Sequence, residues 1–116
     1  MNARAAAFVC KLAFDFDELL PSFARSLEES GGEILPHAFM ANYVYVVLES
    51  DPNENWLHEF LGLLERHLQQ QDDPVSNVIA VSFVEFLVGR PSGTEFAEKH
   101  FGPKLLAQKR LIRGEG

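Results

Sequence analysis

The chain has 116 residues, of which 47% are hydrophobic and 23% are charged, and its formal net charge at pH 7 is −7. This length suits a single domain over residues 1–116, and the apolar content is too high for a disordered acidic chain. No apolar run reaches the roughly 18 residues needed to cross a bilayer, and no signal peptide is recognisable, so we expect no membrane association.

The charges are segregated along the chain. Residues 15–85 contain fourteen Asp or Glu but only two Arg, a net charge of −12, whereas residues 90–116 contain six Lys or Arg and three Glu. An acidic body repels the phosphates of nucleic acids, and it attracts a basic protein or pairs with the basic tail of its own chain. We therefore expect a basic protein partner and no nucleic acid.

Breaker residues divide the first half of the chain into helices. Residues 5–14 form a weak helix candidate, because aromatic and acidic residues alternate directly after them. The next segment is clearly periodic: Leu20 and Phe23 lie at helical spacing, Pro21 fits a first turn, and Gly31–Gly32 predicts the end. A further helix is predicted over residues 36–49, since its β-branched run has no second strand to pair with.

Two Asp-Pro pairs predict the next helix starts. Asp51 and Pro52, with an acid at the third helical position, resemble a capping box, and Asp73 and Pro74 repeat the cap and the proline. The second pair opens a helix over about 74–88 that is apolar on nearly all sides and so predicted to be central. A short helix near residues 95–101 and a peripheral basic helix over about 103–113 follow. The expected fold is all-α: a compact antiparallel bundle of five to six helices.

The central helix carries polar residues within one sector. Wound as an α-helix, it places Asn77, Ser82 and Glu85 within about 140°. A buried carboxylate must be paired, hydrogen-bonded or solvated. We interpret these residues, together with His37, as a polar seam between the central helix and its neighbours. Glu85 at the edge of a ligand or partner groove is the alternative.

The helix at residues 36–49 carries an outward stripe at spacing i, i+4, i+7 and i+11. Ala38, Asn42, Tyr45 and Glu49 form it. An exposed tyrosine among acids suits a protein-binding site, because tyrosine adds rigid amphipathic area. The ordinary reading is a half-exposed surface tyrosine. The predicted partner surface combines the stripe with nearby acidic and aromatic residues, namely Asp51, Asn53, Glu54, Trp56, Asp72 and Asp73.

Catalytic and metal-binding patterns are missing from the sequence. His58 and His67 lie on opposite sides of their helix, and Gly62 stands where a zinc-protease helix needs its second histidine. No nucleophile elbow, phosphate-binding loop or dinucleotide fingerprint occurs. The one cysteine, Cys10, is interpreted as apolar filler in a reducing cytoplasm. We therefore expect no enzyme activity, no cofactor and no metal.

Two segments, EILPHAFMANYV and DDPVSNVIAVSFVEFL, support a family resemblance. Through Leu35, Pro36, His37, Asn77, Ser82, Phe83 and Glu85, residues 17–88 resemble small acidic helical bacterial proteins of uncharacterised or immunity-like type. Asn42 departs from that pattern, in which an acid is expected, and the basic C-terminal part lies outside it. The resemblance implies a bacterial cytoplasmic protein that neutralises a toxin encoded beside it.

Charge pattern and resemblance together favour one function. We expect a non-catalytic cytoplasmic immunity protein that binds and occludes a basic toxin domain through an acidic surface. The alternative is a self-associating regulatory or adaptor domain with no toxin partner, in which an apolar helix face completes a homodimer. Concentration-dependent dimerisation without a basic partner would separate the second function from the first.

Overall fold

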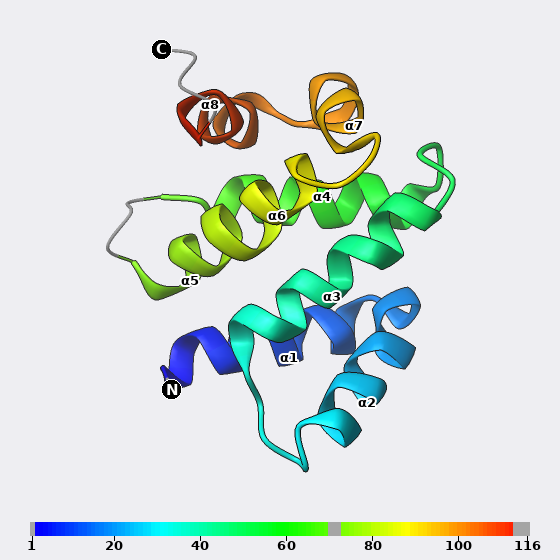
Figure 1. Ribbon diagram of the computed structural model, residues 1–116, viewed down its shortest axis with the longest axis vertical. Helices are drawn as coiled ribbons and strands as arrows, with labels where there is room; N and C mark the ends of the chain where they lie inside the picture. Colours follow the sequence, from blue (N-terminus) through cyan, green and yellow to red (C-terminus); the bar gives the residue numbers. More distant parts are fainter. Residues whose placement is uncertain (1, 70–72, 113–116) are drawn as a thin grey trace.

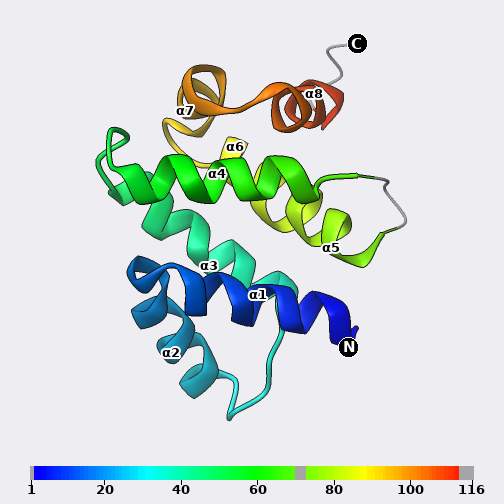
Figure 2. The same cartoon turned by 180° about the vertical axis from the view of Figure 1, so that it is seen from behind.

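A computed structural model describes residues 2–69 and 73–112, and this part of the chain is helical without any strand. The all-α prediction is therefore confirmed. The helical elements are, in order, α1 (Ala3–Asp15), the 3-10 turn η1 (Asp17–Leu19), α2 (Leu20–Glu29), α3 (Pro36–Glu49), α4 (Asn55–His67), α5 (Pro74–Asn77), η2 (Val78–Glu85), α6 (Phe86–Val88), α7 (Gly93–His100) and α8 (Pro103–Ile112). Helices α1 and α2 lie at one end of the molecule and α7 and α8 at the other, with α3, α4 and the α5–η2–α6 helix between them (Figures 1 and 2).

The middle of the fold is the contact between α3 and η2. The inward face of α3 is fully buried and presents Phe39, Tyr43 and Val47. Ile79 and Phe83 of η2 are buried as well, so the 74–88 segment passes through the core. Its central section, η2, is wound as a π-helix, a form frequent at functional sites and uncommon at this length.

Helix α1 forms in spite of its weak sequence signal. The Asn2 side chain caps it by accepting hydrogen bonds from the amides of Arg4 and Ala5, at 3.0 and 3.2 Å. The buried Tyr43 hydroxyl donates to the Val9 carbonyl at 2.8 Å, which fastens α1 to α3, and burial raises the pKa of Tyr43. A local cap and a hydrogen bond to α3 therefore stabilise this helix, for which the sequence carries only a weak signal.

The two Asp-Pro starts have different outcomes. Asp73 caps α5 as predicted: its carboxylate accepts the Ser76 amide at 2.9 Å, and this hydrogen bond lowers the pKa of Asp73. The start predicted at Asp51 is wrong, because the Asp51 carboxylate accepts the Asn53 amide at 2.9 Å in a turn, and α4 begins only at Asn55. The end of α2 follows the prediction, since Gly31 and Gly32 both have positive φ.

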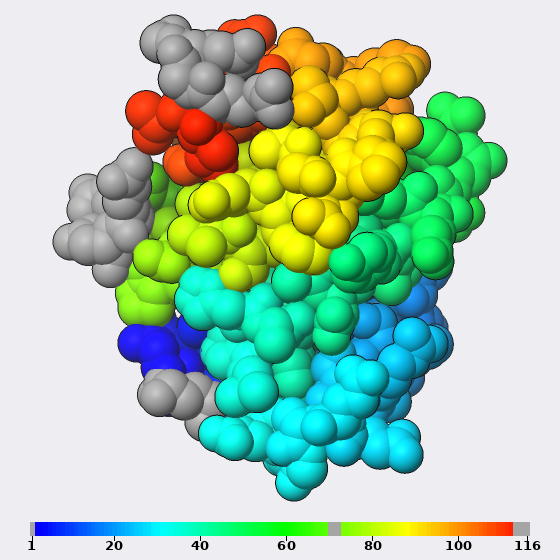
Figure 3. All heavy atoms as spheres, in the orientation of Figure 1, coloured from blue at the N-terminus to red at the C-terminus, as the bar shows by residue number. Residues whose placement is uncertain are grey.

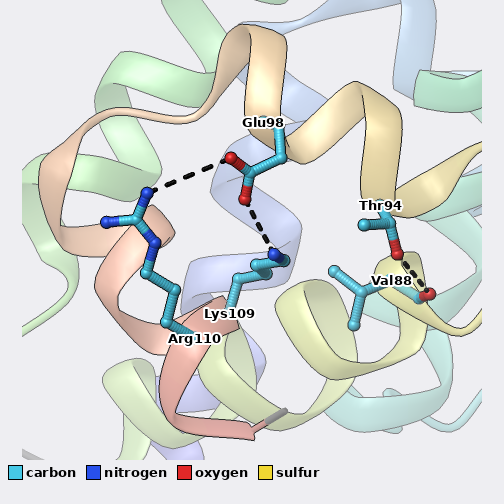
Figure 4. A network of polar contacts seen from close by, with 5 residues as sticks. All are labelled: Val88, Thr94, Glu98, Lys109 and Arg110. Carbon is cyan, nitrogen blue, oxygen red and sulfur yellow. Dashed lines mark hydrogen bonds and ion pairs between the residues drawn. The ribbon is translucent and has the colours of Figure 1, made fainter. Parts of the chain in front are cut away.

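The basic C-terminal helix is part of the core. Leu105 of α8 is fully buried, and the Lys109 side chain is only 5% exposed. The Lys109 ammonium donates to Glu98 of α7 at 2.7 Å, with Arg110 at 4.0 Å from the same carboxylate (Figure 4). In the same view, Thr94 at the start of α7 donates to the Val88 carbonyl. The helix predicted to be peripheral therefore belongs to the packed body, at least through residue 112, and residue 113 lies outside the described part.

A carboxylate from α4 caps the start of α8. Glu65 accepts the amides of Lys104 and Leu105 at 2.5 and 3.0 Å, although it is far from them in sequence. Gly102 makes room for it, since a Cβ at position 102 would lie 2.7 Å from the Glu65 Oε1 atom. These two hydrogen bonds satisfy amides that a helix start leaves unpaired.

Loss of the Glu65 cap should destabilise the protein. We expect Glu65→Ala to lower the free energy of unfolding by about 1–2 kcal/mol, because two helix-terminal amides lose a charged acceptor. Glu59→Ala, at an exposed position of the same helix, is the matched control and should change it by less than about 0.5 kcal/mol. Urea unfolding measures both, and equal losses would contradict a capping role.

The Glu98 ion pair should give a pH-dependent contribution. The hydrogen bond from Lys109 lowers the pKa of Glu98 in the folded state. The ionised carboxylate therefore stabilises the fold above its unfolded pKa of about 4.3, and this contribution disappears as the pH falls through the lower folded pKa. Urea unfolding at several pH values should show Glu98→Gln less stable than wild type at pH 7 and equal to it in strong acid. A difference that stays constant with pH would argue against the ion pair.

Candidate functional site

The polar seam predicted beside the central helix consists of one contact. The His37 Nδ1 atom lies 2.5 Å from the Ser82 hydroxyl, which joins the start of α3 to η2. Ser82 is buried and His37 exposed. The contact lies at the edge of the core, where it satisfies a buried hydroxyl. A hydroxyl beside an imidazole is the first half of a nucleophile–base–orienter series, but no third group in the described residues hydrogen-bonds to His37.

Asn77 and Glu85 do not join that seam. Both are exposed, and they share an outward stripe of the 74–88 helix with Val81, four residues from each. Within the described residues, the Glu85 carboxylate makes no hydrogen bond or ion pair. The interpretation of Glu85 as a member of the polar seam, bonded to a neighbouring helix, is therefore wrong: the helix face that carries it is open to solvent.

The outward stripe of α3 forms one wall of a cleft. Asn42, Tyr45 and Glu49 face α2 across a cleft of about 390 Å³. Asn42 also donates to the Ser26 hydroxyl of α2 at 2.8 Å, which holds the two helices in register at that point. The structure thus brings together three of the predicted partner-binding residues and gives them a concave surface.

The opposite wall of the cleft comes from α2 and the turn before it. Glu18, Ser22, Arg25 and Glu29 line it. Their spacing of i, i+4, i+7 and i+11 repeats that of the α3 stripe, so a second polar stripe was readable in the sequence, and we did not predict it. With Glu49 the cleft contains three carboxylates and one guanidinium, all on exposed residues. Its excess of negative charge suits a cationic ligand group.

Tyr45 stands at the boundary of this cleft and the central helix. Its side chain is 46% exposed, and its ring packs edge-on against Phe86 with centroids 5.6 Å apart. The Arg90 guanidinium lies over the Phe86 ring, 4.5 Å from its centroid. In the space-filling view α3 lies between α2 and the yellow 85–90 segment (Figure 3). Tyr45 is therefore oriented by its neighbours while one part of it stays accessible.

The remaining predicted partner residues serve other roles or face elsewhere. Trp56 is only 8% exposed, packs against Phe16 and Phe60, and donates its indole N–H to Glu54 at 2.9 Å, so its predicted role as an exposed anchor is wrong. Asp51 and Asn53 form the turn before α4. Asp73 caps α5, and Asp72 lies outside the described residues.

Metal-ligating side chains do not gather into a binding group within residues 2–69 and 73–112. No three His, Cys, Asp or Glu side chains there come close enough to hold a metal ion. The rings of His58 and His100 approach to 6.5 Å, but among the described residues they belong to no group of three metal-ligating side chains. Burial raises the pKa of the Cys10 thiol, which disfavours the nucleophilic thiolate.

The comparisons with known proteins give a family without an activity. Residues 10–113 match the family described as Domain of unknown function (DUF7674), and because this match covers most of the chain, the chain belongs to that family. No curated protein and no solved structure matches the chain. Among the described residues, no helix is both long and apolar enough to span a membrane.

Burial of Trp56 can be measured directly, because it is the only tryptophan of the chain. We expect its fluorescence in the folded protein to be blue-shifted from that of the urea-unfolded chain and weakly quenched by iodide, since the indole is shielded from water. Strong iodide quenching in the native state would show that Trp56 is accessible and would restore it as a partner anchor.

Proposed function

We propose that this DUF7674 chain is a non-catalytic binding protein whose acidic cleft between α2 and α3 receives a basic segment of a partner protein. The observation that carries the proposal is the cleft itself: Glu18, Glu29 and Glu49 surround a half-exposed Tyr45 in a concave surface. A flat acidic surface would attract a basic partner. A cleft can in addition bind one particular side chain of that partner.

An arginine side chain matches the chemistry of the cleft. Its planar guanidinium can pair with a carboxylate and lie against the accessible part of the Tyr45 ring. Arg25 on the opposite wall already neutralises part of the local charge, so a ligand with one or two cationic groups fits better than a highly charged one. The long-range field of the acidic body would attract the partner before these contacts form.

The partner that this charge favours is a toxin domain that itself binds nucleic acid. Such a domain needs a cationic surface to hold phosphates, and an acidic cleft is the complement of that surface. The resemblance to immunity-like bacterial proteins supports the same reading, and the all-helical fold agrees with it. Function would then be steric occlusion of the toxin in the bacterial cytoplasm, without catalysis.

The alternative function, a self-associating adaptor without a toxin partner, draws on a different surface. Phe14 of α1 is 85% exposed, which is unusual for a phenylalanine in a soluble domain. The two functions predict different complexes: a basic protein bound at the acidic cleft, or self-association with no basic protein bound. A tagged protein recovered from its native host, followed by mass spectrometry and light scattering of the eluate, distinguishes them.

Charge reversal in the cleft should weaken binding of a recovered partner. We expect Glu29→Lys with Glu49→Lys to slow association at least about tenfold and to reduce its salt dependence, because steering by opposite charge is lost. Glu33→Lys with Glu59→Lys changes the net charge equally at exposed positions outside the cleft and is the matched control. Surface plasmon resonance at two salt concentrations measures all variants.

The control also fixes what would contradict the proposal. If both double variants slow association equally, the whole acidic body attracts the partner and the cleft has no special role. If neither changes the on-rate, the partner binds elsewhere.

Tyr45→Ala tests the contact itself, with an expected increase in dissociation rate of about tenfold or more.

A further inference from the structure

A second concave surface lies between α1 and α2 and is apolar. Its volume is about 600 Å³, and its walls include Ala7, Cys10 and Phe14 of α1 and Leu20 and Phe23 of α2. Phe14 is 85% exposed and Leu20 49% exposed. Two large apolar side chains exposed together at the mouth of a groove indicate a surface that is covered in a complex.

The exposed face of α1 has complementary shapes within itself. Ala3, Ala7, Cys10 and Phe14 follow the spacing i, i+4, i+7 and i+11, so a row of small side chains leads to one bulky ring. A ring of this size can fill the space above small residues on a facing helix. In a pair of identical helices this requires an antiparallel arrangement, because a parallel one would place Phe14 against Phe14. The face therefore fits a second copy of itself, with each Phe14 placed over the small residues of the other α1.

Charges beside the groove are complementary in the same orientation. Lys11 and Asp15 lie on one flank of α1 and form an ion pair with each other at 2.6 Å. In an antiparallel pair of identical helices the same flank faces itself, so Lys11 of one copy approaches Asp15 of the other, and the reverse pair forms too. A highly basic or highly acidic partner would leave one of these two charges unmatched.

We propose that the groove between α1 and α2 is a homodimer interface, in which the α1 helices of two copies pack antiparallel around Phe14. The interface does not depend on the proposed function, because the groove and the acidic cleft use opposite sides of α2: Leu20 and Phe23 face the groove, whereas Ser22, Arg25 and Glu29 face the cleft. A dimer formed in this way carries two open clefts.

The test is the oligomeric state of the chain and of two variants. Analytical ultracentrifugation over a range of protein concentrations should show a mass that rises from 13.0 kDa toward twice that value. Phe14→Asp should weaken dimerisation at least about thirtyfold, because it places a charge in the apolar contact. Phe14 is exposed in the monomer, so circular dichroism and thermal unfolding should show the variant folded. Val81→Asp, at another exposed apolar side chain with 45% exposure, should dimerise as wild type does.

A charge exchange tests the antiparallel arrangement. Lys11→Asp and Asp15→Lys should each weaken the dimer, since both place like charges across the interface, and the double variant should recover most of the wild-type association. A chain that is monomeric at all concentrations overturns the proposal, and so does a dimer that Phe14→Asp leaves intact. A monomeric chain in which Phe14→Asp instead abolishes binding of the basic partner would assign the groove to that partner and likewise reject the dimer.

Discussion

The fold depends on one apolar contact, between α3 and the π-helical section η2. Both elements are buried along most of their facing surfaces, with Tyr43, Phe39 and Phe83 among the largest side chains removed from water. Burying such rings is the main source of folding free energy for a chain of this size. Other helices pack directly on this pair: α1 and α2 on α3, and α8 on η2. Helix α4 packs on α8, and α7 packs on α6 and α8. The acidic cleft forms where α2 meets α3, and the apolar groove forms where α1 meets α2, so both surfaces involve helices that pack on α3.

Some of the acidic residues have structural roles within the chain, and others are exposed around the cleft. Glu65 and Asp73 accept backbone amides at helix starts, and Glu98 pairs with the buried Lys109. These carboxylates are hydrogen-bonded or ion-paired within the chain; Glu65 and Asp73 are partly buried, and the Glu98 side chain is 43% exposed. Glu18, Glu29 and Glu49 are exposed around the cleft without such internal partners in the described residues. The net charge of the chain is thus a poor measure of its binding surface, and the position of each carboxylate is the better one.

Local sequence signals predicted the helices well where backbone chemistry dominates. Pro36 and Pro74 occupy first turns, Asp73 caps, and two glycines with positive φ end α2. They failed where tertiary contacts decide. Asp51 has the same dipeptide as Asp73 but folds into a turn, and Trp56 is buried because Phe16, far away in sequence, covers it.

The α3 wall of the cleft was predictable from the spacing of Asn42, Tyr45 and Glu49. Its pairing with α2 was not, because helical spacing gives the face of each helix but not its neighbour. Glu85 was misplaced for a related reason, since periodicity alone does not say which sector of a nearly apolar helix reaches solvent.

The cap on α8 couples two positions that are distant in the chain. At position 102 a glycine leaves space for the Glu65 carboxylate, whereas the Cβ of any other residue would press against it. The same carboxylate accepts the amides of the two residues that follow Pro103. Neither residue can change alone without cost: a larger residue at 102 displaces the acid, and a shorter or apolar residue at 65 leaves the amides unpaired and a void beside the glycine. During divergence of the family the two positions should therefore be replaced together, most simply by a residue at 102 that caps the helix with its own side chain and frees position 65 to vary.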